Sequence, residues 1–328
     1  RILLSDRRGE DSIARERNVF KPMKVSWKQD MKRNGTVYLM FLPAFLMTFV
    51  LSYLPMFGIV MAFEDYEVRK GFFGSKWVGL QNFVDLFGGG DFLPALRNTL
   101  CIAIIKATVG FVFPIIFAFL LSLLKSRRYK RTVQTCSYLP NFVAAVVVCA
   151  LFTEFLAKDG PLTMLLTKFG AENQNWFAND RIPVFWIIYV LKGVWQGIGW
   201  GSIMYVAAIA TVNGDLHEAA AIDGATRLQR LFKITLPCIM PTIVMMFVLN
   251  IGLSFSTGYD NILLLYMPST YNVADTVYTY TYRLAFGGGG NNYSLSAASG
   301  LFQSLVSTVL LIGSNTLSRK FGDGHSLF

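Results

Sequence analysis

The sequence predicts an all-α membrane protein with six transmembrane helices. Of its 328 residues, 53% are hydrophobic and only 15% are charged, whereas soluble domains carry about 25% charged residues. A bilayer core about 30 Å thick is crossed by about 20 apolar residues in a helix, and six runs of that length occur. They lie near residues 37–63, 97–124, 133–157, 183–212, 237–259 and 295–317. These runs define a transmembrane domain over residues 35–320.

The positive charges predict the direction of the spans. If the N-terminus is inside, the inner segments hold 20 Lys and Arg and the outer loops hold 8. Because positively charged loops are retained in the cytoplasm, we expect both termini to be cytoplasmic. The N-terminal segment 1–34 is basic and is expected to face anionic membrane lipid rather than nucleic acid. A short cytoplasmic tail is expected over residues 321–328.

The loop 213–236, between the fourth and fifth spans, is too long and too alanine-rich for a simple turn. Capping-box spacings that begin at Asp215 and Thr226 predict two short helices, and Gly224 offers a left-handed stop between them. Small residues on the first helix form a surface that another protein can approach closely. The second helix is predicted to carry an apolar stripe of Leu228, Leu231 and Phe232. On these residues alone, an amphipathic connector lying on the membrane surface is an open alternative.

The same loop resembles a known family motif. The string Glu218-Ala-Ala-Ala-Ile-Asp-Gly224, continuing to Ile234, Leu236 and Pro237, is similar to the EAA loop of ABC-importer permeases. In that family the loop is the cytoplasmic coupling helix that docks into a groove on the ATPase. The resemblance therefore implies a type I ABC-importer permease fold. It also implies an ATPase contact made by Glu218, Ala219, Ala220, Asp223 and Gly224.

Other segments resemble the carbohydrate importers within that family. Three segments are similar to those that lead into the second span of maltose- and glycerol-phosphate-type permeases: Phe63-Glu-Asp-Tyr66, Val78-Gly-Leu-Gln-Asn-Phe83 and Leu96-Arg-Asn-Thr-Leu100. Two more segments are similar to the last outer loop and sixth span of those permeases: Tyr282-Arg-Leu-Ala-Phe286 and Ser296-Ala-Ala-Ser-Gly300. The chain most resembles the first permease subunit of bacterial alginate importers. The resemblance implies an oligosaccharide substrate and three kinds of protein partner: a second homologous permease in a heterodimer, two ATPase subunits, and an extracytoplasmic solute-binding protein.

The sequence argues against an enzyme. Its nearest approach to a phosphate-binding loop, Gly71-Phe-Phe-Gly-Ser-Lys76, has the wrong spacing and order, so no cofactor is expected in this chain, and the resemblance places ATP and Mg²⁺ on the partner ATPases. His217 and His325 lack catalytic partners, and the four cysteines lack the spacing of a metal site. An ion-coupled secondary sugar carrier is the alternative, although such carriers place acidic or histidine relays inside the membrane and here the acids avoid the spans.

Two lysines suggest where substrate passes. Lys106 and Lys192 each follow the expected start of their span by nine residues, which is about 14 Å of helix. A lysine at that depth is costly unless it faces a partner, water or an anionic ligand. We hypothesise a path for an acidic sugar such as a uronate; snorkelling, or pairing with another subunit's carboxylate, is equally compatible. Further substrate candidates are Trp195, Trp200, Asn250 and Tyr259, for which membrane-interface or helix-packing roles are alternatives.

Overall fold

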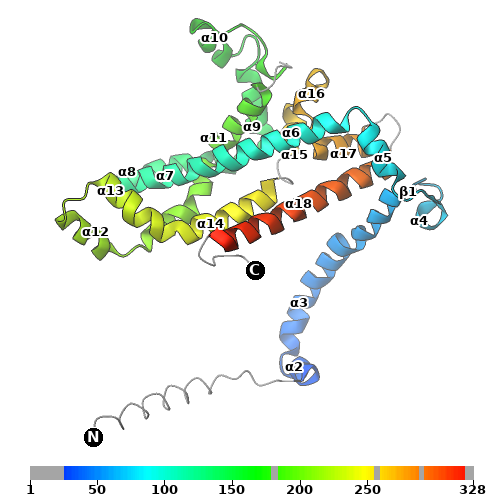
Figure 1. Ribbon diagram of the computed structural model, residues 1–328, viewed down its shortest axis with the longest axis horizontal. Helices are drawn as coiled ribbons and strands as arrows, with labels where there is room; N and C mark the ends of the chain where they lie inside the picture. Colours follow the sequence, from blue (N-terminus) through cyan, green and yellow to red (C-terminus); the bar gives the residue numbers. More distant parts are fainter. Residues whose placement is uncertain (1–25, 179–183, 255–258, 288–291, 322–328) are drawn as a thin grey trace. The chain divides into compact units, whose positions relative to one another are not determined.

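The computed structural model describes residues 26–178, 184–254, 259–287 and 292–321. It divides into two compact units, residues 1–58 and 59–328, and each is considered by itself. Nearly all of the described secondary structure is helical (Figure 1). Most of the basic segment predicted over residues 1–34, and all but Phe321 of the predicted tail, lie outside the described residues.

The first unit contains two helices joined at Asn34. They are α2 (Trp27–Arg33) and α3 (Gly35–Thr48). A π-helical turn η1 (Phe49–Tyr53) and the first five residues of the 3-10 stretch η2 (Leu54–Phe63) follow α3 in this unit. Asp30 accepts hydrogen bonds from the Asn34 amide at 2.8 Å and from the Tyr38 hydroxyl at 2.6 Å. These bonds link α2 to the first turn of α3. The helical run Gly35–Phe63 is long and apolar enough to cross a membrane, in agreement with the first predicted span.

The second unit contains the remaining elements. Before α11 they are β1 (Glu64–Asp65), α4 (Gly71–Gly74), β2 (Lys76–Trp77), α5 (Gln81–Gly88), α6 (Phe92–Ile105), η3 (Lys106–Gly110), α7 (Phe111–Leu123), α8 (Arg127–Tyr138), η4 (Leu139–Phe142), α9 (Ala145–Phe155), α10 (Pro161–Lys168) and η5 (Trp176–Ala178). From α11 onward they are α11 (Val184–Ala210), α12 (Gly214–Ile222), α13 (Arg227–Arg230), η6 (Leu231–Thr235), α14 (Leu236–Ser254), α15 (Tyr259–Leu265), η7 (Pro268–Thr270), α16 (Tyr271–Ala274), α17 (Val277–Phe286) and α18 (Tyr293–Phe321). The two-residue strands β1 and β2 pair antiparallel, a small departure from the all-α prediction.

Four helical runs are long and apolar enough to cross a membrane. They are Gly35–Phe63, Phe92–Leu123, Arg227–Ile251 and Tyr293–Thr316, and they match the first, second, fifth and sixth predicted spans. The fourth predicted span corresponds to α11, a helix of 27 residues. Its polar residues Lys192 and Gln196 lower the mean hydropathy of the helix. The described residues thus give four spans, or five with a bent pair, and the count of six stays a prediction.

The third predicted span, residues 133–157, is sharply bent in the structure and stays a prediction. Arg127–Phe142 and Ala145–Phe155 meet at 96°. Pro140 is the second residue of the short 3-10 turn η4, and Val143 directly after the turn has extended backbone. Because proline cannot donate a backbone hydrogen bond to the preceding turn, the helix breaks there.

Tight helix packing holds the second unit together. α11 packs along α7, and α14 packs along α18 (Figure 1). At Gly199, α11 passes so close to α8 that a Cβ atom would lie 2.2 Å from the Ser137 carbonyl oxygen. Only glycine allows that approach. The largest buried cluster gathers around Phe185, Trp186 and Tyr189 on α11.

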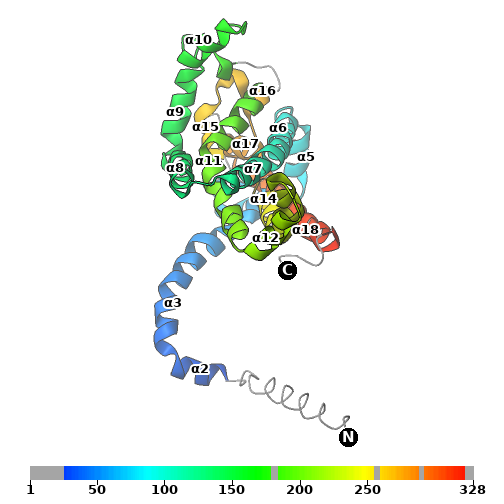
Figure 2. The same cartoon turned by 90° about the vertical axis from the view of Figure 1, so that its left-hand side faces the viewer.

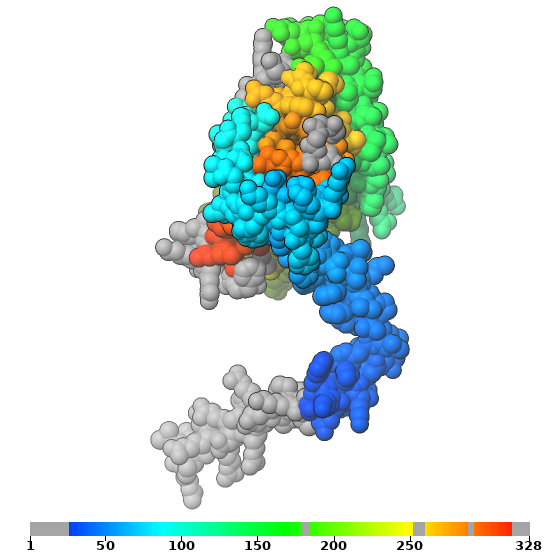
Figure 3. Space-filling view, turned by 90° about the vertical axis from the view of Figure 1, so that its right-hand side faces the viewer, coloured from blue at the N-terminus to red at the C-terminus, as the bar shows by residue number. Residues whose placement is uncertain are grey.

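The two ends of the second unit carry different structures. α12 and α13 lie at one end, and α16 and α17 lie at the other (Figures 1 and 2). The face at the second end is formed by α5 and α6 in cyan, α16 in gold and α17 in orange (Figure 3). There the buried Asn98 of α6 donates 2.9 Å hydrogen bonds to the carbonyl oxygens of Asn272 and Asp275, and Thr99 accepts one from the Val277 amide at 2.8 Å. These bonds fix α16 and α17 to α6.

Candidate functional site: a cationic cavity and an exposed helical loop

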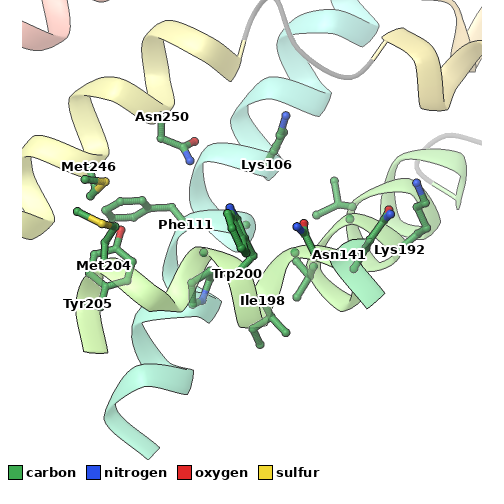
Figure 4. A pocket seen from close by; sticks show the side chains of 18 of the residues that line it. Lys106, Phe111, Asn141, Lys192, Ile198, Trp200, Met204, Tyr205, Met246 and Asn250 are labelled. Atoms are coloured by element: carbon green, nitrogen blue, oxygen red, sulfur yellow. The ribbon is translucent and has the colours of Figure 1, made fainter. Parts of the chain in front are cut away.

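A cavity of about 580 Å³ lies among η3, α7, η4, α11, α14 and α15 (Figure 4). Four of the residues singled out from the sequence line it: Lys106, Lys192, Trp200 and Asn250. They come from three chain segments far apart in sequence. The structure therefore brings together most of the predicted substrate path.

Lys106 stands at the first residue of the π-helical turn η3, between α6 and α7. Its side chain is half-buried. A π-helical turn inside a longer helix inserts an extra residue and is frequent at functional sites. Here it interrupts the Phe92–Leu123 run at the residue that places an ammonium on the cavity wall.

Lys192 is the more enclosed of the two lysines. It is 1% exposed, and its Nζ donates a 2.5 Å hydrogen bond to Oδ1 of Asn261, on α15. The Cys149 thiol lies 3.6 Å from the same oxygen. Lys192 thus has a neutral carboxamide partner within its own chain, which sequence reasoning did not find.

The described lining combines positive charge with neutral polar groups. It contains no aspartate or glutamate among the described residues, while Asn141, Gln196 and Asn261 add carboxamides to Asn250. Gln196 is fixed by a 3.3 Å hydrogen bond to the Val143 carbonyl oxygen. Phe111, Met204, Tyr205 and Met246 gather at the end away from Lys192 (Figure 4). Amide groups beside apolar and aromatic surface suit a ligand with hydroxyl groups and apolar ring faces.

Two predicted substrate residues are not placed in this cavity. Trp195 is absent from the described lining and packs against Phe152, with ring centroids 5.7 Å apart. Tyr259 is the first residue of α15, and its side chain lies outside the described part of the structure. Trp200 lines the cavity and also meets Phe142 edge to face at 5.7 Å.

The loop between α11 and α14 forms the two short helices predicted from its sequence. α12 ends before Gly224, whose φ of +80° is the left-handed conformation expected there. The capping box of α13 is confirmed, because the Thr226 hydroxyl accepts from the Gln229 amide at 3.3 Å and the Gln229 side chain accepts from the Thr226 amide at 2.8 Å. The cap expected at Asp215 is wrong: Asn213 caps α12 and accepts from the Asp215 amide at 3.0 Å.

The residues expected to contact an ATPase lie on the surface of this loop. Glu218, Ala219, Asp223 and Gly224 are exposed, and Ala220 is half-buried. Exposed apolar side chains lie beside them, including Ile222 at 87% exposure. The three residues of the predicted apolar stripe do not share one environment. Leu231 is buried against Phe119 and Ile239, whereas Leu228 and Phe232 are exposed.

Comparison with known proteins agrees with this arrangement. Residues 110–322 match the family described as "Binding-protein-dependent transport system inner membrane component". The Bacillus subtilis polygalacturonan/rhamnogalacturonan transport system permease protein YteP is 38% identical over 288 residues, 88% of each chain.

Two solved structures are also similar. One is a bacterial ABC transporter involved in the import of the acidic polysaccharide alginate, and the other is a bacterial alginate ABC transporter in complex with an alginate pentasaccharide-bound periplasmic protein. Each has a TM-score of 0.81 and 36% identity over 90% of this chain, and the match covers 98% and 97% of the two other chains. In such importers a separate ATPase handles ATP. The chain therefore belongs to the binding-protein-dependent transport system inner membrane components, as a multi-pass permease subunit of the carbohydrate-uptake type in ABC importers.

Proposed function

We propose that this permease passes an acidic oligosaccharide through the cavity lined by Lys106 and Lys192. The observation that carries the proposal is that two lysines share one cavity while no carboxylate is among its described lining residues. An ammonium inside the membrane is stabilised by an anionic ligand, because charges attract strongly where water is scarce. A uronate carboxylate would supply that charge.

The similar proteins support the same substrate class. One solved relative imports alginate, which is described as an acidic polysaccharide, and another relative is named for polygalacturonan and rhamnogalacturonan. The carboxamides of Asn141, Asn250 and Gln196 would bind sugar hydroxyls, and Trp200 offers a face on which a sugar ring can stack.

The proposal extends to the assembly. We infer that the exposed surface around Glu218, Ala219 and Gly224 contacts one of two ATPase subunits, and that the membrane domain pairs with a second, homologous permease. A solute-binding protein would deliver the oligosaccharide at the end of the unit that carries α16 and α17. Both termini and α12 would then face the cytoplasm.

Substrate selectivity tests the cavity. The complex, purified with its native partners and placed in liposomes, would be assayed for uptake of acidic and neutral oligosaccharides of equal length. Lys106→Met and Lys192→Met should each lower kcat/KM for the acidic sugar by about tenfold or more, since charged hydrogen bonds contribute about 1.5–3 kcal/mol. Neutral sugar uptake should change less than twofold, and the exposed Lys168→Met serves as the matched control. Equal losses for both sugars would contradict the proposal.

ATPase stimulation tests the loop. Glu218→Ala should reduce hydrolysis stimulated by the loaded binding protein, whereas Glu172→Ala, an exposed glutamate elsewhere in the chain, should not. Full stimulation in Glu218→Ala would remove the assignment of Glu218. Uptake driven by an ion gradient without ATP would instead support the secondary-carrier alternative.

A further inference from the structure

A second cavity, of about 390 Å³, lies behind the helical loop of α12 and α13. Its walls come from the end of α7, the end of α11, and the loop itself. Four basic side chains line it, namely Lys125, His217, Arg227 and Arg230, together with the hydroxyls of Ser122 and Thr235. No aspartate or glutamate is among its described lining residues.

Two of the basic side chains in this cavity, Arg230 and His217, have hydrogen-bond partners that are not carboxylates. Arg230 Nη1 donates to the His217 carbonyl oxygen at 3.1 Å, and the His217 ring nitrogen Nε2 lies 3.4 Å from the Thr235 hydroxyl. The ion pairs found among the described residues lie elsewhere in the chain. The acidic residues of the loop, Asp215, Glu218 and Asp223, are exposed and are not among the described lining residues.

One donor atom of a side chain that lines the cavity lacks a hydrogen-bond partner among the described residues. Arg230 Nε is buried and has no hydrogen-bond partner in the described part of the structure. A buried donor without an acceptor is destabilising, so such atoms point to a missing group. Arginine offers a planar fork of donors that matches the oxygens of phosphate, and Arg227 and Lys125 lie on the same cavity to share its charge.

We propose that this cavity binds a phosphate-bearing anion, either a free phosphate compound or the headgroup of an anionic phospholipid. The anion lies among the side chains of Arg227, Arg230 and Lys125. Because Lys125 follows α7 while Arg227 and Arg230 belong to the loop, the bound anion ties the loop to the end of α7. Binding of the anion does not depend on the proposed transport function. An effect of the anion on ATPase coupling would rest on that proposed function.

Direct binding to the full chain tests the free-anion source. The chain would be placed in nanodiscs of phosphatidylcholine, and binding of radiolabelled inorganic phosphate would be measured at constant ionic strength. We expect saturable binding that falls by at least about tenfold in Arg227→Gln/Arg230→Gln. The matched control, Arg127→Gln/Arg128→Gln, removes two exposed arginines of α8 that line a different cavity and should bind as the unmodified chain does.

Native mass spectrometry tests the lipid source. In nanodiscs of mixed phosphatidylglycerol and phosphatidylcholine, the unmodified chain and the control should retain phosphatidylglycerol that the Arg227→Gln/Arg230→Gln chain loses. Arg227→Gln alone, at an exposed position, should weaken binding several-fold while leaving Tm unchanged. Absence of both phosphate binding and phosphatidylglycerol retention, or equal loss in the α8 control, would overturn the proposal.

Discussion

Gly199→Ala should destabilise the chain at the crossing of α8 and α11. The added Cβ would lie 2.2 Å from the Ser137 carbonyl oxygen, 2.5 Å from its carbon, and 2.8 Å from Tyr138 Cδ1. Two of these atoms are backbone, so the helices must separate by about 1 Å to restore ordinary contact. Overpacking of this kind costs about 1–3 kcal/mol, and the helix propensity of alanine returns at most about 1 kcal/mol. We expect a net loss in the free energy of unfolding of about 1–2 kcal/mol.

The assay is thermal unfolding read by thiol labelling. Cys149 is 1% exposed and reports unfolding once the half-buried Cys101 and the exposed Cys136 and Cys238 have been changed to serine. Gly193→Ala is the matched control on α11, because nothing lies within 4 Å of its added Cβ. Tm should fall by several degrees in Gly199→Ala and should stay equal or rise in the control. Equal Tm values for the two variants would refute the close-packing argument.

Three further results follow from the structure. Gly224→Ala should lower the free energy of unfolding by about 1–2 kcal/mol, because φ +80° is unfavourable for alanine. ATPase stimulation measured in the same variant would show whether this turn also affects coupling to the ATPase. Asn261→Ala should lower the free energy of unfolding by about 1–3 kcal/mol, because it removes the hydrogen-bond acceptor of Lys192. The loss would be measured as a lower Tm. Burial raises the pKa of Asp275, despite Arg283 beside it. The folded protein therefore binds the Asp275 proton more tightly than the unfolded chain does. The free energy of unfolding should fall as pH rises above about 4, the ordinary pKa of an aspartate. Asp275→Asn should flatten that part of the curve of Tm against pH.

Local signals in the sequence were sufficient for the loop and for most spans. Thr226 and Gln229 fold as predicted because a capping box is formed by residues three apart. Gly224 adopts the left-handed conformation for the same local reason. The apolar runs likewise depend only on neighbouring residues, and four of the predicted spans appear as long apolar helices.

Tertiary contacts explain what the sequence left out. Asn261 meets Lys192 across 69 positions of chain, and no local pattern links the two residues. Asn141 lines the cavity at a sharp turn of the chain within the third predicted span, and nothing in the sequence pattern predicts the angle of that turn. Trp195 has a helical position close to Lys192 in sequence but packs against Phe152 from α9. Hydrophobic periodicity specifies which segments are helical, not which faces meet.

The structure suggests how events at the loop would reach the substrate path. α11 is one continuous helix of 27 residues, about 40 Å long. Lys192 and Trp200 on it line the larger cavity, Ile209 lines the second, and Asn213, three residues after its end, caps α12. A rigid helix passes a displacement of one end to the other. We therefore expect a movement of α12 against an ATPase to shift Lys192 relative to Lys106, which stands on a different helix. An anion in the second cavity would oppose that movement by holding the loop to α7.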